Sequence, residues 1–89
     1  MRYRRSGDVT WELVDDRAVI LDPGGSTLTT LNPIGTLVWQ HLDQPREATE
    51  LGEHLARRFP EVDRHQLESD AGSFLDRLAR DGLVVELAA

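Results

Sequence analysis

Three histidines are the residues of this 89-residue chain best suited to bind a metal ion or to carry a proton. They are His41, His54 and His65, and each is expected on a different helix. Metal sites in proteins usually join histidines three to five residues apart, or join histidine to cysteine, and this chain has no cysteine. We therefore interpret the three histidines as surface or structural residues, and we predict neither a metal site nor a cofactor.

The remaining groups that could support catalysis are scattered along the chain. Asp15 and Asp16 are expected in a tight turn, and most other carboxylates fall on helix faces that water would cover. No serine stands in the Gly-x-Ser-x-Gly setting of a nucleophile elbow. Gly24 and Gly25 precede an expected strand rather than a helix, so they do not form a phosphate-binding loop. The sequence thus favours a protein that is not an enzyme.

Charge and length limit the partners of the chain. A formal net charge of −6 disfavours nonspecific binding to nucleic acid, which requires clustered cations, although a helix-turn-helix reader of DNA remains an alternative. No apolar run in the sequence is long enough to cross a membrane. We therefore expect a cytoplasmic protein with one modest core, without nucleic acid or membrane as a partner. The negative field would favour a basic ligand.

The first third of the chain predicts an antiparallel meander of three strands. Residues 9–14, 18–21 and 26–31 are rich in β-branched or alternating apolar residues, and short turns separate them. The second turn, Asp22-Pro23-Gly24-Gly25, combines a fixed proline φ with two flexible glycines. Because both connections are tight, the first and third strands should form the two edges of the sheet.

The rest of the chain predicts three helices. Asn32 and Pro33 are typical of a helix start, and Ile34 begins an apolar stripe that leaves Trp39 outside it, where a second core contact is the simpler interpretation. Further helices are expected at 47–59 and 63–81, and 83–85 should pack back as an extended segment. Asp63 and Gln66 predict a capping box for the third helix, and Gly82 its end.

The predicted fold class is therefore α+β, similar to a winged helix-turn-helix, with a three-stranded antiparallel sheet followed by three helices. Residues 1–7 are expected to be a flexible basic tail, and residues 8–89 a single domain. The strand at 26–31 has no charge to protect its outer edge. It could bind an extended peptide as an added strand, unless another element of the chain or a second copy covers it.

Short motifs in the expected order resemble those of PqqD-like proteins, also called RiPP recognition elements, where RiPP denotes a ribosomally made and post-translationally modified peptide. The matching residues are Leu31-Asn32 with Gly35, Val38-Trp39 with Leu42-Asp43 and Pro45, Glu50-Leu51 with Leu55 and Phe59, and Phe74-Leu75 with Leu78 and Gly82-Leu83-Val84. The resemblance implies a domain without catalytic activity. Such proteins bind the leader segment of a precursor peptide as an added strand and present it to a separate modifying enzyme or leader peptidase.

Carried over to this chain, the resemblance implies that the third strand pairs with the leader and that the third helix completes the groove. The implied peptide-binding residues are Ser26, Thr27, Leu28, Thr29, Thr30, Leu31, Leu67, Asp70, Ala71, Phe74, Arg77 and Leu78. Two departures from the family pattern stand out. Many PqqD proteins of quinone-cofactor biosynthesis carry Cys-Asp-Gly where this chain has Leu42-Asp43-Gln44, and a helix-capping threonine is replaced by Glu47. The missing cysteine favours lasso-peptide maturation, with pyrroloquinoline quinone biosynthesis or another RiPP pathway as the alternative.

Overall fold

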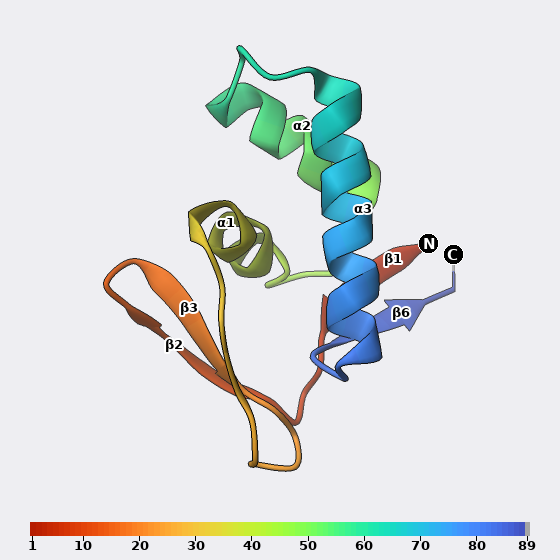
Figure 1. Cartoon of the computed structure of the whole chain (residues 1–89). Coiled ribbons are helices and arrows are strands. Elements are labelled where there is room, and N and C mark those ends of the chain that lie inside the picture. The colour runs from red at the N-terminus through yellow and green to blue at the C-terminus, as the bar shows by residue number, and fades with distance from the viewer. Residues whose placement is uncertain (89) are drawn as a thin grey trace.

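Two three-stranded antiparallel sheets and three helices make up the protein in a computed structural model, which describes residues 1–88 (Figure 1). The elements are β1 (Arg2–Arg5), β2 (Thr10–Val14), β3 (Arg17–Leu21), β4 (Leu28–Thr30), α1 (Pro33–His41), β5 (Arg46–Glu47), α2 (Ala48–Arg58), α3 (Arg64–Arg80) and β6 (Val84–Leu87). The α+β class, the first sheet and the three helices agree with the sequence prediction. The second sheet was not predicted. No helix within residues 1–88 is both long and apolar enough to cross a membrane.

The first sheet has the strand order β2-β3-β4, so the predicted meander is confirmed. Asp15 and Asp16 join β2 to β3, and both have positive φ values of 52° and 64°. Positive φ at both central residues is the geometry of a type I′ turn, whose twist matches that of a hairpin. The third strand is shorter than predicted, because regular pairing extends only from Leu28 to Thr30.

Asp22 determines where β4 begins. Its Oδ1 accepts hydrogen bonds from the Ser26 N–H at 2.8 Å and the Thr27 N–H at 3.1 Å, and these bonds lower the pKa of the Asp22 carboxyl. Gly25 takes a φ of 72°, which glycine adopts at little cost. Ser26 and Thr27 are therefore held in the turn rather than in the strand.

Helix α1 begins as predicted, with Asn32 as N-cap and Pro33 at the first position. Its buried face is rotated relative to the prediction. Ile34 is 44% exposed, whereas Trp39 is fully buried and meets Trp11 edge to face with ring centroids 6.0 Å apart. The interpretation of Trp39 as a core residue is confirmed, and the placement of Ile34 in the core is wrong. The first turn of α1 extends past the core and leaves Ile34 facing a groove.

A buried hydroxyl ties α1 to the first sheet. Thr36 is buried, and its Oγ1 accepts the Ala18 N–H of β3 at 2.9 Å. Replacing Thr36 by valine should lower the free energy of unfolding by about 1–3 kcal/mol, because the buried Ala18 N–H would lose its acceptor. Urea unfolding measures this loss. Thr36→Ser keeps the hydroxyl acceptor and loses only the methyl group, so it serves as the control and should lose less stability than Thr36→Val. A Thr36→Val variant as stable as the parent chain would contradict this role of the hydroxyl.

Helices α2 and α3 pack closely, since a Cβ at Gly52 would lie 2.9 Å from the Glu68 Cα. The capping box forms at α2, where the Glu47 N–H donates to the Glu50 side chain at 3.1 Å. At α3 the Asp63 cap is confirmed, but the predicted box is wrong, because the Gln66 side chain donates to Asp70 instead. Gly82 follows α3 with a φ of 75°, as predicted.

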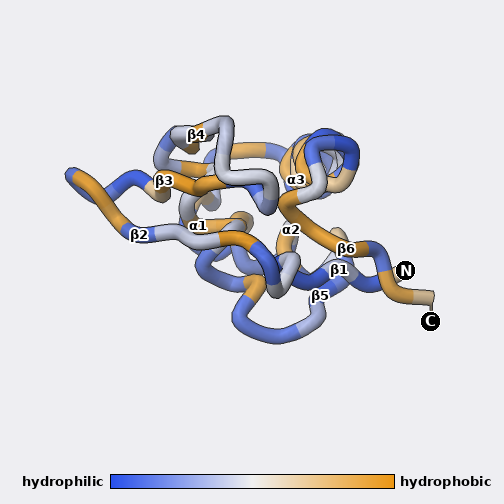
Figure 2. The backbone as a smooth tube through the Cα atoms, turned by 90° about the horizontal axis from the view of Figure 1, so that it is seen from below, coloured by the Kyte–Doolittle hydropathy of each residue, from blue (hydrophilic) through white to orange (hydrophobic). Residues whose placement is uncertain are grey.

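The second sheet brings the two ends of the chain together in the order β5-β1-β6 (Figure 2). Arg2–Arg5 were expected in a flexible tail, and that prediction is wrong for these residues, which form β1 and pair with β6 along its whole length. Tyr3 is buried, and its hydroxyl donates to Asp76 at 3.3 Å. The Arg5 guanidinium donates to the Trp39 carbonyl at 2.9 and 3.0 Å and lies over the Trp11 ring.

Candidate peptide-binding site

Strand β4 pairs with β3 on one side and forms an edge of the described sheet. The Asp22 N–H donates to the Thr27 carbonyl, and the Leu31 N–H donates to the Ala18 carbonyl. Hydrogen-bonded pairs alternate in an antiparallel ladder, so Thr29, between Thr27 and Leu31, is the residue of β4 that bonds toward β3. The N–H and C=O groups of the two residues beside it, Leu28 and Thr30, consequently point away from β3.

A groove of about 530 Å³ lies between α1 and α3. The segment that contains β4 runs on the side of the first sheet that faces α3 (Figure 1). The lining residues come from all three helices and from the residue that caps α1; they are Asn32, Ile34, Gly35, Val38, Leu55, Leu67, Asp70, Ala71, Ser73, Phe74, Arg77 and Arg80. Gly35 lets the two helices approach, because a Cβ there would lie 3.0 Å from the Phe74 Cζ.

The lining of the groove combines apolar side chains with polar groups and with charge of both signs. Ile34 and Phe74 present partly exposed apolar surface, while Asp70, Arg77 and Arg80 supply one carboxylate and two guanidinium groups. An apolar cavity with a few polar groups is typical of a ligand site. The local charge is not acidic, although the whole chain carries −6. The expectation of a basic ligand, which rested on net charge, therefore does not extend to the lining of this groove.

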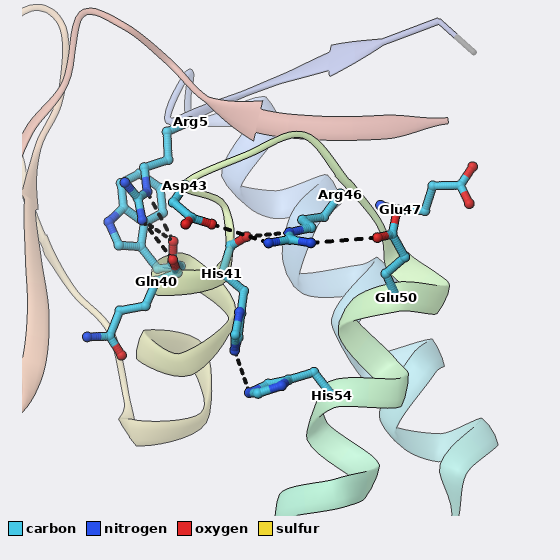
Figure 3. Close-up of polar contacts among 9 residues, drawn as sticks. Arg5, Gln40, His41, Asp43, Arg46, Glu47, Glu50 and His54 are labelled. Carbon is cyan, nitrogen blue, oxygen red and sulfur yellow. Dashed lines mark hydrogen bonds and ion pairs between the residues drawn. The ribbon is translucent and has the colours of Figure 1, made fainter.

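A second cavity of about 280 Å³ lies between α1 and α2 (Figure 3). His41 and His54 meet there through their Nε2 atoms. Burial is the main cause that lowers the pKa of both imidazoles, and the nearby Arg46 and Arg57 lower it further. Both rings should thus be neutral at pH 7. The sequence predicted surface or structural histidines and gave no sign of this contact.

Comparison with known proteins places the chain in a family. The sequence model described as coenzyme PQQ synthesis protein D (PqqD) matches residues 17–84, a segment that contains β3, β4 and all three helices. The chain belongs to the PqqD family. Among curated proteins no match was found.

Three solved structures share the fold over almost the whole chain. TbiB1 in complex with the TbiA(beta) leader peptide is 27% identical, with a TM-score of 0.85 over 97% of this chain and 99% of that one. A lasso peptide synthetase B1 complexed with the leader peptide is 22% identical, with a TM-score of 0.83 over 97% and 100%. The PqqD truncation of Methylobacterium extorquens PqqCD, described as a functional and stand-alone RiPP recognition element, is 17% identical, with a TM-score of 0.78 over 96% and 89%. The predicted resemblance to PqqD-like proteins is confirmed.

Relative to this PqqD-family fold, the predicted site residues fall into three groups. Five residues of α3 line the groove: Leu67, Asp70, Ala71, Phe74 and Arg77. Leu78 is buried in the core and does not reach the groove. Of the strand residues, Leu28 is 67% exposed and Leu31 is buried, as expected from alternation along a strand.

The sequence missed the contribution of α1 to the groove. Ile34, Gly35 and Val38 line it from α1, and Asn32 does so from the cap. The apolar stripe that begins at Ile34 predicted a core position for this residue, but Ile34 is 44% exposed, whereas Val38 is buried. The sequence carried one signal for this. Ile34 lies in the first turn of its helix, where no earlier turn covers the apolar side chain.

Proposed function

We propose that this PqqD-family protein binds the leader segment of a ribosomally made precursor peptide by strand addition to β4 and delivers it to a separate leader peptidase or modifying enzyme, in lasso-peptide maturation. The observation that carries the proposal is the edge position of β4 together with the groove that begins at Asn32, two residues after the strand ends. In strand addition, the backbone of the peptide pairs with the sheet edge, and its alternate side chains enter pockets beside that edge.

The strand edge and the groove would have different roles in recognition. The outward groups of Leu28 and Thr30 would pair with the leader backbone, at ~0.5–1.5 kcal/mol net for each hydrogen bond, because each bond replaces one to water. These bonds are independent of sequence. Selectivity would come from leader side chains that enter the groove between Ile34 and Phe74, and from the charges of Asp70 and Arg77.

Lasso-peptide maturation is favoured over quinone-cofactor biosynthesis by two observations. A neighbour described as lasso peptide synthetase B1 complexed with the leader peptide shares the fold over 97% of this chain and 100% of its own. The loop after α1 also lacks the cysteine of many PqqD proteins, and Leu42 at that point is buried in the core. A leader-binding role without catalysis also agrees with the absence of a nucleophile motif in the sequence.

Fluorescence anisotropy with a labelled leader tests the proposal. The probe is a synthetic leader segment from a short precursor open reading frame, to be identified among the genes adjoining this one, and its scrambled sequence is the control. We expect saturable binding of the leader and at least about tenfold weaker binding of the scrambled peptide, a difference of ~1.4 kcal/mol. Equal binding of the two peptides, or preferential binding of a DNA duplex, would contradict the proposal.

A further inference from the structure

The contact between His41 and His54 is a feature that leader binding does not explain. His41 is the last residue of α1, and His54 lies in the middle of α2. Their Nε2 atoms face one another at the open cavity between the two helices, as Figure 3 shows. We propose that His41 and His54 form a two-histidine site for a divalent transition-metal ion such as Zn²⁺, and that the ion links α1 to α2.

The geometry suits imidazole coordination. Each neutral imidazole offers one ring nitrogen with a lone pair, and a zinc–nitrogen bond is about 2.0–2.1 Å long. An ion between the two Nε2 atoms requires them to lie somewhat further apart than they do here. Both rings are only partly buried and border an open cavity of about 280 Å³, and the ion would require the side chains to rotate apart into it.

Carboxylates are at hand for the remaining coordination positions. Glu50 lies one helical turn before His54 on α2, and Glu53 lines the same cavity. Glu50 lies 3.9 Å from the half-buried Arg46, and Glu53 lies 2.7 Å from the exposed Arg64. The exposed pair of Glu53 with Arg64 contributes little free energy, so the Glu53 carboxylate could leave its arginine and join water as a ligand. The described residues include no preformed cluster of three ligands.

The charges around the cavity balance, so the ligand atoms rather than the surrounding charge would select the ion. Two acidic and two basic side chains line it: Glu50, Glu53, Arg46 and Arg57. The surroundings therefore offer no strong general attraction for cations. Affinity would come from imidazole nitrogen, which favours Zn²⁺, Ni²⁺ and Cu²⁺, whereas Mg²⁺ and Ca²⁺ prefer oxygen ligands.

A linked ion would act next to the groove. Val38, one turn before His41, and Leu55, directly after His54, both line the groove between α1 and α3. Fixing α1 against α2 at the histidines would hold these two apolar residues at a constant separation. An ion that binds only the folded chain would also raise its melting temperature, by mass action.

Isothermal titration of the tag-free, intact chain with ZnCl₂ tests the proposal, and the chain provides its own control. His65 lies exposed at the start of α3. We expect His41→Gln and His54→Gln each to weaken Zn²⁺ binding by about tenfold or more, since changes outside the first ligand shell alone cost about 10–100-fold. His65→Gln should bind Zn²⁺ like the parent chain, and MgCl₂ should give no binding in any variant.

If circular dichroism shows that a variant does not fold, an NMR titration of the parent chain with ZnCl₂ takes the place of the calorimetric comparison. Zn²⁺ should then shift the imidazole resonances of His41 and His54 and leave those of His65 unchanged. The proposal is overturned if Zn²⁺ does not bind, if the three glutamine variants bind it equally, or if only the resonances of His65 respond. Each of those results would describe scattered histidines rather than a paired site.

Discussion

Replacing Thr30 by proline should weaken leader binding by roughly tenfold and leave the fold intact. The Thr30 N–H points away from β3, so the substitution removes a donor that the sheet does not use. The lost bond contributes ~0.5–1.5 kcal/mol, and the proline ring also obstructs the incoming strand. Thr29 precedes it in extended backbone, as the residue before a proline prefers. Anisotropy with the leader measures the loss, and thermal unfolding checks the fold.

The matched control is Thr29→Pro, one residue earlier in β4. The Thr29 N–H is directed at Ile20 inside the sheet, so proline there should destabilise the protein rather than affect the leader alone. From the sequence, the side of the strand to which each N–H points is not known; the register supplies it. Unchanged affinity in a folded Thr30→Pro variant would mean that the leader does not pair with β4.

Replacing Phe74 by alanine should lower both stability and leader affinity. The ring is partly buried against the core and also lines the groove, where it fills the space left by Gly35. Replacing a fully buried phenylalanine by alanine costs about 3–5 kcal/mol of unfolding free energy, and we expect a smaller loss for the partly buried Phe74. Urea unfolding and anisotropy report the two effects separately. A loss of stability with unchanged affinity would assign Phe74 to the core alone.

Ile34→Ala separates the groove from the core, because Ile34 is 44% exposed and lines the groove. We expect it to weaken leader binding with a change of stability below that of Phe74→Ala. Leu13→Ala is the matched control: Leu13 is 46% exposed, but it lies on β2 and does not line the groove. A similar loss of affinity in the Leu13 and Ile34 variants would contradict the role of the groove in leader binding.

Local signals in the sequence predicted most of the first sheet and the helix ends. Asp15 and Asp16 suit a tight turn, Asn32 with Pro33 starts a helix, and Gly82 ends one, since each acts through its own backbone conformation or side chain. β1 was missed because Arg2–Arg5 contain a single apolar residue, Tyr3, and form a strand only through pairing with β6. Such pairing is a property of the tertiary fold.

The candidate site was predicted in part for a similar reason. The helix periodicity and the family resemblance identified the face of α3 that lines the groove, but they also included Leu78, which the core covers. Ile34 was assigned to the core because periodicity reports that a face is apolar, not what lies against it. The contact of His41 with His54 depends on how α1 crosses α2, which residue spacing does not encode.

Amide hydrogen exchange, read by NMR with and without saturating leader, tests strand addition to β4 most directly. In the free protein the Thr29 amide should exchange slowly, whereas the amides of Leu28 and Thr30 should exchange fast, because they point away from β3. We predict that the leader slows exchange at Leu28 and Thr30 and changes Thr29 little. Saturable leader binding that leaves Leu28 and Thr30 exchanging as fast as before would contradict the account.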